Sequence, residues 1–183
     1  MGNLCIIPAR GGSKRIPRKN IKEFLGKPII AYSIKAAIDS GLFDEVMVST
    51  DNLEIADIAK KYGAKVPFMR SANNSDDFAT TFDVIKEVIN YYKDQSIEFD
   101  NLCCLYSCAP FVNPKVLLRA YNQLTKNFFD TVFPIIPFSF PIQRALRVNQ
   151  GKVSMILEDN LNIRSQDLEK SFHDAGQFYW CNT

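Results

Sequence analysis

A short apolar segment near the N-terminus leads directly into a glycine-rich, basic loop. Residues 4–7 are apolar and predict a buried strand, which Pro8 ends because proline has no N–H to donate to a sheet ladder. Gly11, Gly12 and Ser13 follow closely. The loop also carries five cations, which are Arg10, Lys14, Arg15, Arg18 and Lys19. Since glycine lets the chain turn sharply and leaves its N–H groups uncovered, this segment predicts a cradle for phosphate oxygens.

The loop matches neither of the two common nucleotide-binding motifs. The sequence contains no G-x-x-x-x-G-K-[ST] string and no G-x-G-x-x-G string, and the absence of the second disfavours a dinucleotide-dependent oxidoreductase. A basic turn that is only solvated is the alternative interpretation. The order strand, Gly-Gly, Ser and cations favours phosphate binding over that alternative.

Length, charge and cysteine content exclude several classes of protein. A chain of 183 residues predicts one domain, and a net charge of +2 is too small to predict a nucleic-acid-binding protein. The chain has five cysteines without a C-x-x-C pair and one histidine, which disfavours a zinc site and a disulfide framework. Free thiols predict a reducing cytoplasm. We expect no signal peptide, because the chain reaches the basic loop within ten residues of its N-terminus. We expect no membrane segment either, because no apolar run approaches the roughly 20 residues that a membrane helix needs.

Apolar strand-like segments alternate with amphipathic helical patterns over most of the chain. Strands are predicted at residues 4–7, 46–48, 65–69, 101–105 and 131–136. Helices are predicted to start near Pro28, Asp51, Thr80 or Thr81, and Asn113-Pro114, with Gly41 and Gly63 ending the first two. This order predicts an α/β fold with a Rossmann-like, doubly wound and mainly parallel sheet that has helices on both faces. The loops that follow the strands, including residues 49–51 and 106–110, should then meet the basic loop at one edge.

The pattern changes after residue 137. Segments 145–148 and 153–156 flank Asn149-Gln150-Gly151 and predict a hairpin. The aromatic run at residues 178–180 predicts a return of the chain to the sheet. We therefore expect a single domain over residues 1–183, with a nucleotide-binding core over 1–137 and an inserted arm over 138–175.

The basic loop also resembles the signature of a known family. Residues 8–14, Pro-Ala-Arg-Gly-Gly-Ser-Lys, and residues 17–20, Pro-Arg-Lys-Asn, resemble the cytidylyltransferases that activate nonulosonic acids, the sialic-acid-like sugars. The resemblance implies transfer of CMP from CTP to a nine-carbon 2-keto sugar acid with release of pyrophosphate. It also implies a homodimer whose arm contributes to the sugar site. Later segments resemble the pseudaminic acid branch of the family, namely residues 106–111, 141–146, 164–169 and 173–180.

Three alternatives stay open beside this interpretation. The chain could instead belong to the CMP-N-acetylneuraminate or the CMP-3-deoxy-octulosonate synthetases. Tyr106 and the Gln143-Arg144 pair argue against both, because Tyr106 replaces a glutamine that sialic acid synthetases usually carry. The third alternative belongs to another class: a truncated CTP-binding protein without catalysis.

The resemblance assigns roles to particular residues. It implies that the nucleotide is bound by Arg10, Gly11, Gly12, Ser13, Lys14, Lys19, Asn20, Arg70, Thr80 and Thr81, with Arg10 and Lys19 catalytic. It implies that the sugar is bound by Tyr106, Gln143, Arg144, Arg164, Gln166 and Tyr179. An arginine fork suits the carboxylate of the sugar, although Arg164 as a plain surface residue is the alternative. Thr80 and Thr81 could instead cap a helix.

Other catalytic groups are weaker candidates. His173 is the single histidine and a candidate general base, but no activated nucleophile stands near it in the sequence. Cys104 and Cys108 suit small buried apolar positions better than nucleophiles. The family holds Mg²⁺ on an Asp-x-Asp pair near its C-terminus, and no such pair follows the aromatic run here. We therefore expect the Mg²⁺ ligands beyond Thr183, with Asp51 as a possible substitute.

Overall fold

The computed structural model describes residues 2–183, which divide into two compact units. The larger unit runs from the N-terminal strand to Phe133 and resumes from Gly176 to Thr183, and the smaller unit comprises Pro134–Ala175. The smaller unit is thus inserted into the sequence of the larger one, and the arm predicted over residues 138–175 falls within it. Among the described residues, no helix is long and apolar enough to cross a membrane.

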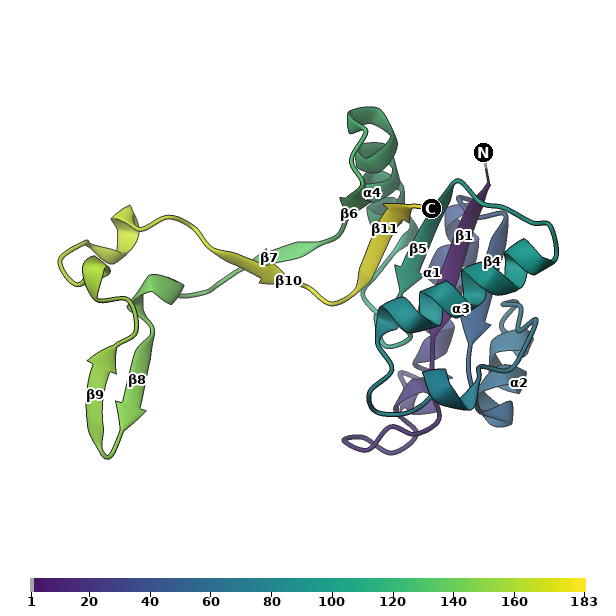
Figure 1. Cartoon of the computed structure of the whole chain (residues 1–183), viewed down its shortest axis with the longest axis horizontal. Coiled ribbons are helices and arrows are strands. Elements are labelled where there is room, and N and C mark those ends of the chain that lie inside the picture. The colour runs from purple at the N-terminus through teal and green to yellow at the C-terminus, as the bar shows by residue number, and fades with distance from the viewer. Residues whose placement is uncertain (1) are drawn as a thin grey trace. The chain divides into compact units, whose positions relative to one another are not determined.

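A five-stranded mixed sheet forms the centre of the larger unit, in the order β4-β1-β5-β11-β6 (Figure 1). The strands are β1 (Asn3–Pro8), β4 (Glu45–Ser49), β5 (Asn101–Leu105), β6 (Thr131–Val132) and β11 (Phe178–Asn182). Strand β1 pairs in parallel with β4 and β5, whereas β11 runs antiparallel to β5 and β6. The predicted return of the aromatic run to the sheet is confirmed, because β11 fills the place between β5 and β6.

Four helices cover both faces of this sheet, as the sequence predicts. They are α1 (Ile30–Ser40), α2 (Leu53–Lys61), α3 (Thr81–Asp94) and α4 (Pro114–Asn127). Side chains alternate along β1, so that Cys5 and Ile7 pack in a cluster with α1, α2 and α4, while Leu4 and Ile6 pack against α3. In Figure 1, α3 crosses in front of β1 and α1 lies behind the sheet.

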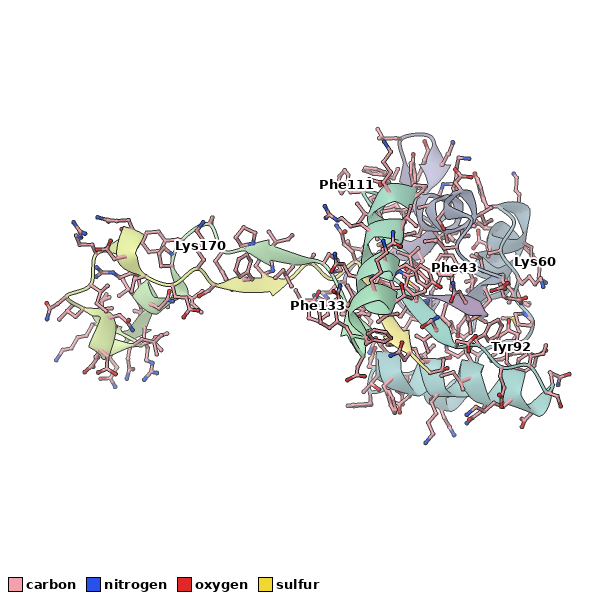
Figure 2. The ribbon with its side chains drawn as sticks, turned by 90° about the horizontal axis from the view of Figure 1, so that it is seen from above. Phe43, Lys60, Tyr92, Phe111, Phe133 and Lys170 are labelled. Atoms are coloured by element: carbon pink, nitrogen blue, oxygen red, sulfur yellow. The ribbon has the colours of Figure 1, made fainter. Side chains whose placement is uncertain are left out.

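Aromatic side chains complete the packing on both faces. Phe43 stacks on the fully buried ring of Trp180 with ring centroids 4.9 Å apart, on the face covered by α1 and α4. Tyr92 of α3 packs on the other face and donates a hydrogen bond of 2.6 Å to Glu45. Figure 2 labels Phe43 and Tyr92 within the larger unit.

The predicted helix ends are partly confirmed. Thr80 caps α3 in a capping box with Asp83, and Asn113 caps α4. Pro28 does not start α1, which begins at Ile30, because Pro28 lies in the short edge strand β3 (Lys27–Pro28) paired with β2 (Glu23–Phe24). Asp51 does not cap α2 either, since Asn52 accepts the hydrogen bond from the helix. Asp51 is thereby available to the neighbouring loop.

Prolines explain two strand predictions that were wrong. Residues 65–69 form no strand beyond an isolated bridge between Met47 and Lys65, because Pro67 lacks the N–H that a longer ladder needs. The segment predicted as one strand over residues 131–136 is divided at Pro134. Its first part is β6 in the main sheet, and its second part is β7 (Ile135–Pro137) in the smaller unit.

The smaller unit consists of two antiparallel pairs joined by short helical turns. Strand β7 pairs with β10 (Phe172–Asp174), and β8 (Leu146–Asn149) pairs with β9 (Lys152–Met155). The predicted hairpin is confirmed, with Gln150 (φ 48°) and Gly151 (φ 75°) in the left-handed region that a two-residue hairpin turn requires. The 3₁₀ turns of the chain are Lys19–Ile21, Ala72–Asn74, Ile142–Arg144, Glu158–Asn160 and Ser165–Asp167.

Candidate functional site

The basic loop lines a hollow of about 760 Å³ at the carboxyl end of β1. Tyr106, Ser107 and Cys108, which follow β5, line the same hollow. The loop after β4 is tied to the basic loop, because Ala9 N–H donates to the Ser49 carbonyl at 2.9 Å. The predicted convergence of these loops at one edge is therefore confirmed. The remaining lining residues are Pro8, Arg10, Ser13, Lys14, Arg15, Ile16, Lys19, Asn20, Arg70, Asp77, Ala79, Thr80, Thr81, Val84 and Gly176.

Asp51 and Asn52 determine the path of the glycine-rich loop. The N–H of Gly11 donates to the Asp51 carboxylate at 2.7 Å, and Ser13 N–H donates back to the Gly11 carbonyl at 2.9 Å. A Cβ on Gly11 would lie only 2.9 Å from the Asn52 Cβ, whereas a Cβ on Gly12 would meet no atom within 4 Å. Glycine is thus required at position 11 by the close approach of α2, and the space around Gly12 would admit a side chain.

This difference predicts unequal effects of two similar substitutions. Gly11→Ala is expected to raise the KM for CTP about tenfold, because the loop must shift away from Asn52 and misplace its N–H groups. Gly12→Ala is the matched control and is expected to change KM by less than about twofold. Steady-state kinetics of the two variants checks the prediction, and equal effects would contradict it.

Asn20 joins the basic loop to the segment after β5. It is buried, and its amide Nδ2 donates to the Arg10 carbonyl at 2.8 Å while its Oδ1 accepts a hydrogen bond from Ser107 Oγ at 2.8 Å. Lys19 precedes it in a 3₁₀ turn and is exposed on the wall of the hollow. The buried amide therefore fixes the backbone from which the Lys19 ammonium extends.

Arg70 is the buried cation of the site, with a relative exposure of 7%. Its Nε donates to Ser49 Oγ at 2.9 Å, and its terminal Nη2 donates to the Ser49 carbonyl. Burial lowers the pKa of the Arg70 guanidinium, and the nearby carboxylate of Asp51 opposes that shift. Ser49 uses two of the five N–H donors of the guanidinium, so that donors remain for a ligand in the hollow.

The two threonines differ in their roles. Thr80 Oγ1 accepts a hydrogen bond from the N–H of Asp83 at 3.2 Å, so the capping alternative holds for Thr80. Thr81 is the first residue of α3, and its Oγ1 lies 3.5 Å from the hydroxyl of Tyr106. Both line the hollow, and the Thr81–Tyr106 pair brings two hydroxyl groups from α3 and the end of β5 to one wall.

An acidic residue that sequence reasoning missed lies among the loop cations. One oxygen of Asp77 lies 3.0 Å from Arg10 Nη2, and its other oxygen pairs with Lys14 Nζ. Asp77 stands in a polar loop next to Asp76, and nothing in the local sequence singles it out. The contact joins residues 63 positions apart for Lys14, so only the fold reveals it.

Tyr106 and Tyr179 form an aromatic pair next to the hollow. Their ring centroids lie 5.6 Å apart in an edge-to-face arrangement, and Phe133 packs on Tyr179 at 5.7 Å. Tyr106 lines the hollow, whereas Tyr179 contacts the Tyr106 ring without lining the hollow. Gly11 and Gly12, also predicted to contact the nucleotide, lie in the loop next to the lining residues.

The remaining predicted sugar contacts lie in the smaller unit. Gln143 donates to the Glu169 carbonyl at 3.0 Å, and Arg144 donates to the carbonyls of Leu161 and Ile163. Arg164 Nε pairs with Asp167 at 2.6 Å, and Gln166 is exposed in the adjacent 3₁₀ turn. His173 is also exposed there, with its ring against Phe138 at 5.0 Å.

Thiols and carboxylates supply no further reactive centre to the hollow. Burial raises the pKa of the Cys104 thiol to about 12, and burial also raises that of Cys108. Among residues 2–183, no group of three or more His, Cys, Asp or Glu side chains could hold a metal ion. Asp77 is flanked by two cations, and Asp51 accepts a hydrogen bond from the Gly11 N–H.

Comparisons with known proteins agree with this geometry. The family model described as "Cytidylyltransferase" matches residues 4–177. A pseudaminic acid cytidylyltransferase of Campylobacter jejuni is 51% identical over 181 residues, covering 98% of this chain and 78% of that protein. An N-acylneuraminate cytidylyltransferase A of Danio rerio is 43% identical over 96% of this chain and 40% of its own length.

A solved structure supports the fold. A CMP:2-keto-3-deoxy-manno-octonic acid synthetase complexed with CTP aligns with a TM-score of 0.72 at 20% identity. The alignment covers 100% of this chain and 74% of that one. The α/β, Rossmann-like prediction is thus confirmed.

Proposed function

Because this chain belongs to the cytidylyltransferase family, we propose that it transfers CMP from CTP to pseudaminic acid and releases pyrophosphate. The observation that carries the proposal is the hollow, which Arg10, Lys14, Lys19 and Arg70 line together. Such a site suits a polyanion whose charge shifts during reaction. The 51% identity with a relative that is named for this activity supports pseudaminic acid as the acceptor.

The proposed reaction needs positioning and charge neutralisation. A hydroxyl oxygen of the sugar acid attacks the α-phosphorus of CTP and loses its proton to water, the bond from that phosphorus to the bridging oxygen breaks, and pyrophosphate leaves with the electron pair. Arg10, Lys14 and the Gly11-Gly12-Ser13 segment are the proposed contacts of the β- and γ-phosphates. Lys19 acts at the α-phosphate, where negative charge moves toward the leaving group. Arg70 and Thr81 are the proposed contacts of the base.

Tyr106 and Tyr179 of the larger unit, and separately Arg164 of the smaller unit, are the proposed contacts of the sugar acid. Tyr106 presents its hydroxyl on the wall of the hollow. Arg164 offers a planar fork that matches a carboxylate, and its pair with Asp167 holds the fork in one orientation. Gln143, Arg144, Gln166 and Tyr179 are the supporting candidates for the sugar.

Arg164→Ala is expected to raise the KM for the sugar acid about tenfold or more, with the KM for CTP unchanged. The reason is that a carboxylate loses a bidentate, charge-assisted partner, worth about 1.5–3 kcal/mol. Arg147→Ala is the matched control, because Arg147 is an exposed arginine of the same unit. A defect confined to CTP would contradict the assignment.

We also propose that the protein is a homodimer formed through the smaller unit. That unit leaves many large apolar side chains exposed, including Phe140, Leu146, Val148, Val153 and Leu161. Exposed apolar groups at this density suit a subunit interface, and a second copy of the chain is the proposed occupant. Sedimentation velocity is expected to show a dimer, and a monomer at micromolar concentration would contradict this.

Two further expectations accompany the proposal. The cytoplasm is the proposed location, because Cys5, Cys103 and Cys104 are buried free thiols that suit a reducing compartment. Mg²⁺ is expected to accompany CTP. Mg²⁺ usually takes one or two carboxylates together with phosphate oxygens.

The substrate is tested by pyrophosphate release from CTP with pseudaminic acid and N-acetylneuraminic acid assayed in parallel. We expect release with pseudaminic acid and little with the other sugar. Release with N-acetylneuraminic acid alone would overturn the proposed acceptor. Binding of CTP without release in either assay would favour the alternative of a nucleotide-binding protein without catalysis.

A further inference from the structure

The Asp77 carboxylate is paired with two of the cations that the proposed function assigns to the phosphates. One of its oxygens lies 3.0 Å from Arg10 Nη2 and the other pairs with Lys14 Nζ. The hydrogen bond from Lys14, with a further contribution from Arg10, lowers the pKa of the Asp77 carboxyl. The group is therefore negative at neutral pH. All three side chains line the hollow.

The backbone holds Asp77 in this place. The neighbouring Asp76 carboxylate accepts the N–H of Phe78 at 2.8 Å and that of Ala79 at 2.7 Å, which closes a tight turn before α3. Arg10 also donates through Nη1 to the Asp76 carbonyl. Arg10 thus makes contact with the turn at two points, and the carboxylate next to it is directed at the basic loop.

We propose that Asp77 is an internal counter-anion that competes with phosphate groups, and above all with product pyrophosphate, for Arg10 and Lys14. This inference rests on the proposed function and deepens it. The donors that face the Asp77 oxygens are those that a phosphate oxygen would need. A bound phosphate chain must therefore either displace the carboxylate or remain beside it as a like charge. Both arrangements weaken phosphate binding relative to a site without Asp77.

The consequence falls mainly on product release. CTP has a base and a ribose that make further contacts, for example with Arg70 and Thr81, so it can overcome the competition. Pyrophosphate has only its phosphates. The same penalty falls on both ligands, but only CTP has base and ribose contacts that keep its binding productive, so pyrophosphate is left as the weaker ligand. The Arg10–Asp77–Lys14 arrangement forms again as pyrophosphate departs.

A second ion pair of the same loop provides a comparison. Arg18 pairs with Glu54 and neither residue lines the hollow. Glu54→Gln removes one carboxylate from a loop cation just as Asp77→Asn does, but at a place where no phosphate is expected. Any general effect of net charge on anion binding appears in both variants, and a local competition appears only in Asp77→Asn.

The test is calorimetric titration of the purified protein with inorganic pyrophosphate. For Asp77→Asn we expect a Kd roughly tenfold lower than for the unchanged protein, with a difference that shrinks as salt is added. The Kd of Glu54→Gln for pyrophosphate should stay within about twofold of that of the unchanged protein. Asp77→Glu keeps the carboxylate, so it should bind pyrophosphate as weakly as the unchanged protein. In turnover assays, pyrophosphate should inhibit Asp77→Asn at correspondingly lower concentration.

The outcomes separate this inference from the function on which it rests. Arg10→Ala serves as the reference for the phosphate site and should weaken pyrophosphate binding. If it does so while Asp77→Asn binds pyrophosphate no tighter than the unchanged protein, the counter-anion role is overturned and the phosphate site stands. If Arg10→Ala has no effect either, both the counter-anion role and the proposed phosphate site are overturned.

Discussion

Lys19→Ala is expected to lower the kcat of pyrophosphate release about a hundredfold, while the KM for CTP changes by less than about threefold. The Lys19 ammonium is exposed on the wall of the hollow, and its backbone is held by the buried amide of Asn20. A cation in this position is needed most when charge moves onto the leaving group. Its loss therefore affects the transition state more than the bound substrate.

Lys22→Ala is the matched control for this prediction. Lys22 is an exposed cation three positions further along the same segment, and it does not line the hollow. Steady-state kinetics with saturating sugar acid is the measurement. An unchanged rate for Lys19→Ala, or an effect confined to the KM for CTP, would remove its catalytic role.

Arg70→Lys is expected to lower kcat/KM for CTP about a hundredfold, mainly through KM, although the charge is kept. Lysine is a point charge that cannot reproduce the two bonds to Ser49 and present a planar fork to the base at once. We also expect the free energy of unfolding to fall by about 1–3 kcal/mol, because buried polar atoms of Ser49 lose a partner.

Two further variants separate the orientation of Arg70 by Ser49 from the general effect of replacing an arginine by a lysine. Ser49→Ala removes one of the bonds that orient Arg70 and leaves the guanidinium in place, so a smaller loss of CTP affinity is expected. Arg119→Lys, at an exposed arginine of α4, should change neither CTP binding nor stability. Thermal unfolding and CTP titration measure both quantities, and a normal KM for Arg70→Lys would contradict a role in base binding.

Local signals allowed much of the fold to be predicted. Thr80 and Asn113 cap the helices that the sequence predicts, because a cap depends on a side chain and the N–H groups two or three residues away. Gly41 ends α1 in the left-handed conformation, which glycine adopts easily because it has no Cβ. The alternation of apolar strands and amphipathic helices depends only on periodicity, so the sheet with helices on both faces was predictable.

The errors have equally specific causes. Asp51 and Asn52 are both good caps, and their neighbours in the sequence do not decide between them. The fold does, because Gly11 N–H comes close enough to occupy the Asp51 carboxylate. Pro67 and Pro134 interrupt the strands expected over residues 65–69 and 131–136, because proline lacks the N–H that a continued ladder needs.

The sequence predicts some residues of the site and misses others. Arg10, Lys14 and Lys19 were identified from composition and spacing within one loop, and the hollow does contain them. Asp77 was missed because its contact with Lys14 spans 63 positions. Arg70 was predicted by resemblance. Its burial and its two hydrogen bonds to Ser49 depend on its position beside the end of β4, which only the fold reveals.

The central claim is tested most directly by following CTP and pseudaminic acid with the protein by ³¹P NMR. The account predicts that the three CTP resonances disappear together and are replaced by one phosphodiester resonance of the CMP-sugar and one of pyrophosphate, in the ratio that a single transfer requires. The same experiment with Lys19→Ala should give the same products slowly. Unchanged CTP in the presence of the sugar acid, or release of orthophosphate without a phosphodiester, would contradict the account.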